Sequence, residues 1–135
     1  RGCFIVQRAY QAKHGIWKYF TADDGQVDLS QYSYLVIGTL VSYKEMCKYF
    51  GKENMIPLYV EVEDGLRLSR ALERERQQAA PKYAEMCRRF LADSEDFSEK
   101  NLQDAGITKR FQNFDFQKCV SEIYDYIGIQ ENGFT

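Results

Sequence analysis

Two apolar segments, each followed by a helical pattern, constrain the fold of this chain more than any other feature. Residues 34–38, Tyr-Leu-Val-Ile-Gly, form a continuous apolar run of the kind that fills a buried strand. Residues 55–62 form a second run, in which Pro57 near the start donates no ladder hydrogen bond. Because strands that alternate with helices form parallel sheets covered by helices, the pattern predicts an α/β fold with a parallel sheet.

The rest of the chain gives further expected elements and their boundaries. Strands are expected at residues 3–9, 16–21 and 109–114, and a turn is expected at residues 22–26 because Asp24-Gly25 is a hairpin dipeptide. Helices are expected at residues 40–50, at 63–78, from Pro81 onward, as a short segment within 93–105, and after Asp115. The expected buried faces are Val41, Met46 and Tyr49; Leu68 and Leu72; Tyr83, Met86, Cys87 and Phe90; and Val120, Ile123, Tyr124 and Ile127.

Length and charge exclude several classes of protein. The chain of 135 residues is one domain or a piece of one, and its net charge of -2 gives no basic field for nucleic acid. It has neither a membrane-spanning apolar run nor a secretory signal. The four cysteines are widely spaced and the chain has one histidine, which makes a poor zinc set. We expect buried, reduced thiols in a cytoplasmic protein with no protein-bound metal.

An arginine-rich segment follows directly from the second apolar run. It spans residues 66–76 and resumes at residues 82–90, after Gln-Gln-Ala-Ala-Pro. Arginine presents a planar charged fork that suits phosphate oxygens, so two such helices joined by an elbow are suited to closing over a polyphosphate. The alternative is a solvated helical surface, on which Glu73, Glu75 and Glu85 neutralise their neighbours. The charge pattern alone favours the solvated surface, and the rest of the chain shifts the balance toward phosphate binding.

Three blocks of sequence resemble the guanylate kinase family, in particular a divergent bacterial guanylate-kinase-like group. The first block begins with Ile-Pro-Leu-Tyr-Val-Glu-Val-Glu-Asp-Gly at residues 56–65 and continues through the arginine helices to Asp93. The second, Phe-Gln-Asn-Phe-Asp at residues 111–115, is similar to the family's last strand before its final helix. The third, residues 10–21, contains His14-Gly15 and is similar to the family's Tyr-Gly-Thr turn. Together these blocks cover nearly the whole chain.

The resemblance implies a P-loop nucleoside monophosphate kinase fold with a parallel sheet, flanking helices and a helical lid. Residues 1–33 would belong to the monophosphate-binding lobe, 34–65 to core strands and a helix, 66–93 to the arginine-rich lid and 94–135 to the C-terminal core. The implied activity is transfer of a phosphoryl group from ATP to GMP, with Mg²⁺ as the metal ion. Nucleotides would then be the partners, without nucleic acid or membrane.

The resemblance also implies roles for particular residues. Arg70, Arg74 and Arg89 would be catalytic lid arginines that meet the phosphates of the donor. Arg76 is an alternative to Arg74 for the same lid position. Asn113 would lie beside the donor adenine, and the predicted cofactor-binding residues are Arg76 and Asn113. The predicted substrate-binding residues are Tyr10, His14 and Gly15.

The chain also departs from the family pattern. It contains no G-x-x-x-x-G-K motif followed by Ser or Thr, so the first strand, loop and helix of the family would lie before Arg1. The glutamate that would bind guanine is replaced by Val6, which puts base specificity in doubt. We therefore expect a fragment without kinase turnover, of low stability or self-associating through open strand edges. A guanylate-kinase-like module that binds proteins, without catalysis, is the alternative function.

Overall fold

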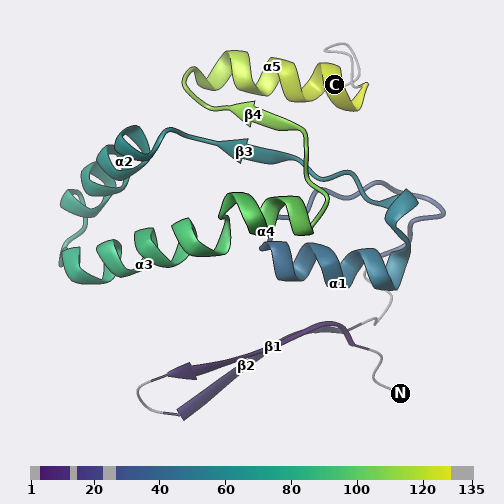
Figure 1. Ribbon diagram of the computed structural model, residues 1–135, viewed down its shortest axis with the longest axis horizontal. Helices are drawn as coiled ribbons and strands as arrows, with labels where there is room; N and C mark the ends of the chain where they lie inside the picture. Colours follow the sequence, from purple (N-terminus) through teal and green to yellow (C-terminus); the bar gives the residue numbers. More distant parts are fainter. Residues whose placement is uncertain (1–3, 13–14, 23–26, 129–135) are drawn as a thin grey trace. The chain divides into compact units, whose positions relative to one another are not determined.

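The computed structural model describes residues 4–12, 15–22 and 27–128, with the backbone alone described for the first two ranges. The chain divides into two compact units, residues 1–56 and residues 57–135 (Figure 1), and each is described by itself. Among the described residues, no helix has the length and apolar content needed to cross a membrane.

The first unit begins with two paired strands. β1 (Phe4–Ala12) and β2 (Gly15–Ala22) run antiparallel, from the pair Phe4 and Ala22 to the pair Ala12 and Gly15. Both expected strands are confirmed, with longer bounds than the sequence indicated. Cys3 and most of the expected turn at residues 22–26 lie outside the described residues.

Helix α1 (Leu40–Phe50) has the bounds that the sequence predicted. Thr39 begins it, since its Oγ1 accepts a hydrogen bond from the Ser42 backbone N–H at 3.2 Å. Gly51 ends it at φ 90°, a conformation that favours glycine, and the short helix η1 (Lys52–Asn54) follows. The expectation that Val41 faces inward is wrong, because its side chain is 48% exposed and Leu40 is the buried residue.

The apolar run at residues 34–38 is not a strand, which corrects the first sequence expectation. Leu35 is 86% exposed and Ile37 is 98% exposed, and residues 33–39 have no regular secondary structure. A strand needs a second backbone to satisfy its N–H and C=O groups. Among the described residues, no backbone pairs with this segment.

The second unit contains a strand–helix–strand crossover. β3 (Tyr59–Glu61) leads into α2 (Asp64–Arg76), α3 (Tyr83–Asp96) and α4 (Glu99–Asp104), and β4 (Arg110–Gln112) then returns parallel to β3. Val60 pairs with Phe111 at the centre of the two strands. The predicted parallel, α/β character is confirmed for these two strands. The strand predicted at residues 55–62 is shortened to three residues, the same length as β4.

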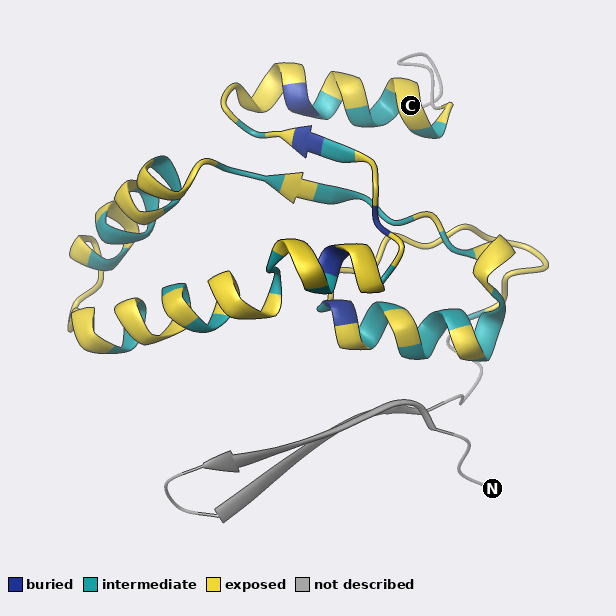
Figure 2. Cartoon of the chain, in the orientation of Figure 1, coloured by how far each residue is buried: buried dark blue, intermediate teal, exposed yellow. Residues whose placement is uncertain are grey.

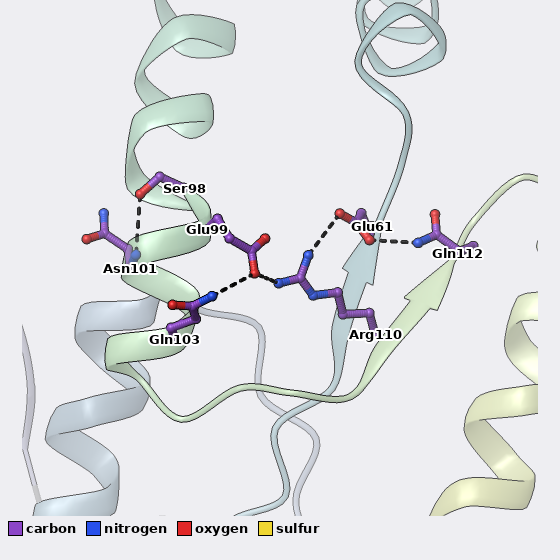
Figure 3. A network of polar contacts seen from close by, with 7 residues as sticks. All are labelled: Glu61, Ser98, Glu99, Asn101, Gln103, Arg110 and Gln112. Atoms are coloured by element: carbon purple, nitrogen blue, oxygen red, sulfur yellow. Dashed lines mark hydrogen bonds and ion pairs between the residues drawn. The ribbon is translucent and has the colours of Figure 1, made fainter.

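Side-chain caps fix where the helices of this unit begin. The Glu63 carboxylate accepts hydrogen bonds from the Gly65 and Leu66 backbone N–H groups, at 2.8 and 2.9 Å, and so begins α2. Asp115 begins the last helix, α5 (Phe116–Ile127), by accepting from the Lys118 backbone N–H at 2.9 Å. Both caps were predicted from the sequence. In Figures 1 and 3, α4 lies on one side of the strand pair and α5 on the other.

The buried residues of this unit lie around β4. Leu102, Ile107, Phe111 and Cys119 are buried, and the rings of Phe111 and Tyr126 meet edge to face at 5.4 Å. Figure 2 shows no buried residue on α2 or α3, in agreement with their side-chain exposures. The prediction that Leu68, Tyr83 and Cys87 are buried is therefore wrong, because all three residues are exposed. Helices α2 and α3 contact mainly each other and leave most of their surface in solvent.

Candidate functional site

The carboxyl ends of β3 and β4 form one edge of the parallel pair. The two strands end at Glu61 and Gln112, and the Asn113 backbone N–H continues the pairing by donating to the Glu61 carbonyl at 2.9 Å. Glu61, Val62, Glu63, Asp64 and Gln112 line an open hollow of about 360 Å³ at this edge. Ligands of parallel sheets bind beyond the carboxyl ends of the strands, so this edge is the candidate site.

Arg70 joins α2 to the loop between β4 and α5. Its Nη1 donates to the Asn113 carbonyl at 2.9 Å and its Nη2 donates to the Phe114 carbonyl at 3.2 Å. The structure thus brings together a predicted catalytic residue and a predicted cofactor-binding residue, 43 positions apart in the chain. In this arrangement the Arg70 fork is occupied by neutral carbonyls rather than open to an anion.

Asn113 has a polar atom without a partner. Its Oδ1 is buried and makes no hydrogen bond with any described residue. A buried acceptor left unpaired costs about 1–3 kcal/mol, so such an atom marks either strain or a binding contact that is still to be made. Asn113 is the residue that the sequence predicts to lie beside the donor base.

Arg74 and Arg76 differ in the face of α2 that they occupy. Both side chains are exposed, and neither has a polar contact with another described residue. Arg74 follows Arg70 by four positions and shares its face, whereas Arg76 follows by six and lies on a different face. Because Arg70 faces the candidate edge, helix geometry favours Arg74 over Arg76 as the residue nearer to that edge.

Arg67 has a role that the sequence did not indicate. Its Nη2 donates to Ser94 Oγ at 2.6 Å, and its guanidinium carbon lies 3.9 Å from the centre of the Phe90 ring. It therefore fastens α2 to α3 through a hydrogen bond and a cation–π contact. The sequence carries no signal for this contact, because Phe90 and Ser94 are more than 20 positions away.

Arg88 and Arg89 share the carboxylate of Glu85 on α3. Arg88 contacts both of its oxygens, at 2.5 and 2.8 Å, while Arg89 contacts one oxygen at 3.4 Å. Hydrogen bonds from Arg88, with a smaller contribution from Arg89, lower the pKa of Glu85 to about 2. Both arginine side chains are 66% exposed, so the longer contact leaves Arg89 the less restrained of the two.

A polar network that the sequence analysis missed lies around Arg110 (Figure 3). Arg110 donates to Glu61 at 3.3 Å and to Glu99 at 2.5 Å, and Gln112 Nε2 donates to the second Glu61 oxygen at 2.6 Å. The bond from Arg110 lowers the pKa of Glu99. Glu61 thus has both oxygens engaged, which makes it a structural carboxylate at the edge rather than a general base.

The predicted substrate-binding residues belong to the other unit. Tyr10 pairs with Trp17 across the β1–β2 ladder, and Gly15 is the first residue of β2. Val6 lies in β1 opposite Thr21. His14 lies outside the described residues, so the structure does not test its assignment.

The structure also tests the expectation that the cysteines are buried. Burial raises the pKa of the Cys119 thiol, as expected for an unreactive core cysteine, but Cys87 is exposed and that expectation is wrong. Cys87 lies on α3, which has no buried face. Within residues 27–128, no three His, Cys, Asp or Glu side chains lie close enough together to hold a metal ion.

Comparison with known proteins gives no relatives. The chain matches no protein-family model, and neither the curated proteins nor the solved structures contain a significant match. A functional assignment for this chain must therefore be argued from its own residues and their geometry.

Proposed function

We propose that residues 57–135 form the donor-nucleotide side of a nucleoside monophosphate kinase of the guanylate kinase type. In this proposal Arg74 and Arg89 bind the phosphates of ATP, and Asn113 lies beside the base. The family resemblance of the arginine helices supplies the reaction class. It also supplies the finer fold assignment, a P-loop kinase fold in which α2 and α3 form the lid.

One observation carries the proposal. The parallel crossover leads from the carboxyl end of β3 straight into α2, and Arg70 joins that helix to the residues that follow β4. Arg74 then lies one helical turn beyond this joint, exposed and without a polar contact to another described residue. A guanidinium without a polar partner, on the helix that follows the carboxyl end of a parallel strand, is suited to an anionic ligand.

The chemistry that such arginines supply is charge stabilisation. A phosphoryl group in transfer spreads negative charge over three oxygens, and catalysis consists mostly of positioning and neutralising that charge. Arg89, held to Glu85 by one long contact of 3.4 Å, is free to exchange that carboxylate for a phosphate. Arg88, which contacts both oxygens of Glu85, is the more firmly held neighbour.

Mg²⁺ enters this proposal only as the ion that ATP phosphates carry. The described carboxylates at the edge do not form a metal cage, since both oxygens of Glu61 are bonded to Arg110 and Gln112. No step is assigned to the ion. GMP is the proposed acceptor, with Tyr10, His14 and Gly15 on its side, and Val6 leaves the base that is accepted open. The cytoplasm, where ATP and GMP occur, is the proposed location.

Nucleotide titration tests the proposal with matched variants. We expect the chain to bind ATP, and Arg74→Ala and Arg89→Ala to weaken that binding about tenfold each, since a hydrogen bond to a charged group is worth roughly 1.5–3 kcal/mol. Arg76→Ala and Arg88→Ala are the controls, each exposed beside its test residue, and we expect less than a twofold change. Calorimetry measures both effects. Equal effects in the test and control variants, or no ATP binding by the wild type, would contradict the proposal.

A protein-binding module is the second candidate, because one observation favours it. Leu35, Val36 and Ile37 form an exposed run of aliphatic side chains, and such runs mark protein contacts more often than nucleotide sites. The same titration separates the two candidates. ATP binding that depends on Arg74 supports the kinase, whereas no ATP binding leaves the module.

A further inference from the structure

Helix α2 has few anchors to the rest of its unit. None of its residues is buried, and Glu63 caps it through local backbone contacts. Arg67 fastens it to α3, which also has no buried residue. Among the described residues, the polar contacts between α2 and the loop that follows β4 are those of Arg70.

Arg70 contacts the short loop of residues 113–115, which connects β4 to α5. The Asn113 backbone is held on both sides, with its N–H on the Glu61 carbonyl and its own carbonyl on Arg70. Phe114 follows, with its carbonyl accepting from Arg70 and 64% of the residue's surface exposed, and Asp115 then begins α5. The Arg70 fork therefore fixes the backbone that presents Asn113 and Phe114 at the carboxyl edge.

The chemistry of the contact separates Arg70 from the other arginines. Two successive carbonyls are neutral acceptors at a fixed spacing, and a guanidinium supplies two parallel donors that match them. A lysine carries the same charge but presents a point donor, so it cannot hold both carbonyls in the same geometry. A phosphate-binding arginine responds differently, because its contribution comes mainly from charge.

We infer that Arg70 is a positioning residue: its fork latches α2 onto residues 113–114 and sets the shape of that loop, and it does not bind phosphate. This inference departs from the catalytic role that the resemblance implies for Arg70. Its consequence for nucleotide affinity rests on the proposed function, whereas the latch itself does not. Arg74 and Arg89 remain the proposed phosphate-binding residues.

Amide hydrogen exchange without ligand tests the latch directly. In Arg70→Lys we expect the Asn113 and Lys118 amides to exchange at least tenfold faster, because both depend on the loop backbone. The Leu102 amide in α4, bonded to the Ser98 carbonyl, reports the global fold and should not change. Arg74→Lys is the matched control, one turn away on the same face, and should leave all three amides unchanged. Unchanged exchange at Asn113 and Lys118 in Arg70→Lys would overturn the latch.

A measurement on the wild-type chain tests the same contact without any substitution, so it can be used even if Arg70→Lys does not fold. Proton NMR should give separate Nη1 and Nη2 signals for Arg70, because two carbonyls restrict rotation of its guanidinium, and one averaged set for Arg74. An averaged set for Arg70 would overturn the latch without any substitution.

Salt dependence of ATP binding separates the latch from a phosphate contact. We expect Arg70→Ala to weaken ATP binding by the same factor at low and high salt, and Arg74→Ala to reduce the salt dependence itself. A reduced salt dependence in Arg70→Ala, equal to that in Arg74→Ala, would show that Arg70 meets phosphate and would overturn the inference. If wild type binds no ATP, the proposed function fails, and the exchange experiment still decides the latch.

Discussion

Two segments were expected to be strands, residues 34–38 and residues 109–114. The structure forms a strand only in the second, at residues 110–112. The first segment is uncharged and almost wholly apolar, but Leu35 and Ile37 lie in solvent. The second contains Lys109 and Arg110, but its central Phe111 is 1% exposed. Apolar composition therefore does not decide which segment becomes a strand.

Partners decide it. β4 pairs with β3, packs its Phe111 ring against Tyr126 of α5, and is joined to α4 by the ion pair between Arg110 and Glu99. Among the described residues, the backbone of residues 35–38 has no hydrogen bond. Backbone hydrogen bonds and one buried face, that of Phe111, are available to β4, and neither is available to the more apolar segment.

Removing the buried ring should give the largest difference between the two regions. Phe111→Ala should lower the free energy of unfolding by about 3–5 kcal/mol, since the ring is fully buried. Ile37→Ala, in the exposed segment, should change it by less than about 0.5 kcal/mol. Urea denaturation measures both, and Phe111→Leu gives a milder version if the alanine variant does not fold. Comparable losses in the two regions would contradict the comparison.

The cap that follows β4 should give an intermediate effect. Asp115→Ala removes the oxygen that accepts the Lys118 backbone N–H, and should cost about 0.5–2 kcal/mol of stability. Gln117→Ala, exposed in the same first turn, is the control and should be close to neutral. An equal effect in both variants would mean that the cap does not anchor α5.

Acid should weaken the β4 region selectively. Hydrogen bonding from Arg110 lowers the pKa of Glu99 from its ordinary 4.5, so the ion pair stabilises the fold above that pH. This stability is lost as the pH falls through the lowered pKa, because the folded state must then bind a proton. The melting temperature of wild type should therefore fall more between pH 6 and pH 3 than that of Glu99→Gln. The two curves should remain parallel if the pair contributes nothing. Because Glu99 is exposed, the expected difference is small.

The exposed segment should give the smallest change in stability and a clear change in association. Ile37→Lys replaces a side chain that already lies in solvent, so the free energy of unfolding should change by less than about 0.5 kcal/mol. The added charge should lower any concentration-dependent self-association, because open apolar segments are contacts between copies. Sedimentation velocity measures this effect, with Lys44→Ala on the exposed side of α1 as the control.

The parts of the fold that follow from local signals were predictable. Glu63 marks the start of α2, Gly51 marks the end of α1 and Asp115 marks the start of α5, because caps depend on residues a few positions apart. The alternation of strands and helices predicted the parallel, α/β character, but not that β3 would pair with β4. The strand expected at residues 34–38 failed because strand formation depends on a distant partner.

The same division applies to the candidate site. The arginines were recognisable from composition, but their tasks were not, because the Arg70 contact with residues 113–114 spans more than 40 positions. The ties of Arg67 to Phe90 and Ser94, and of Arg110 to Glu61 and Glu99, are likewise tertiary. Spacing along one helix indicates which arginines share a face, but not what lies opposite that face.

Amide hydrogen exchange in the wild-type chain compares the two segments most directly. If partners decide strand formation, the amides of Leu35, Val36 and Ile37 should exchange at the rates of an unfolded peptide. The Asn113 amide, bonded to the Glu61 carbonyl at 2.9 Å, should exchange at least roughly 100-fold more slowly than its own unfolded rate. Comparable protection of residues 35–37 and of Asn113 would contradict the account, because it would mean that the apolar run has a pairing partner after all.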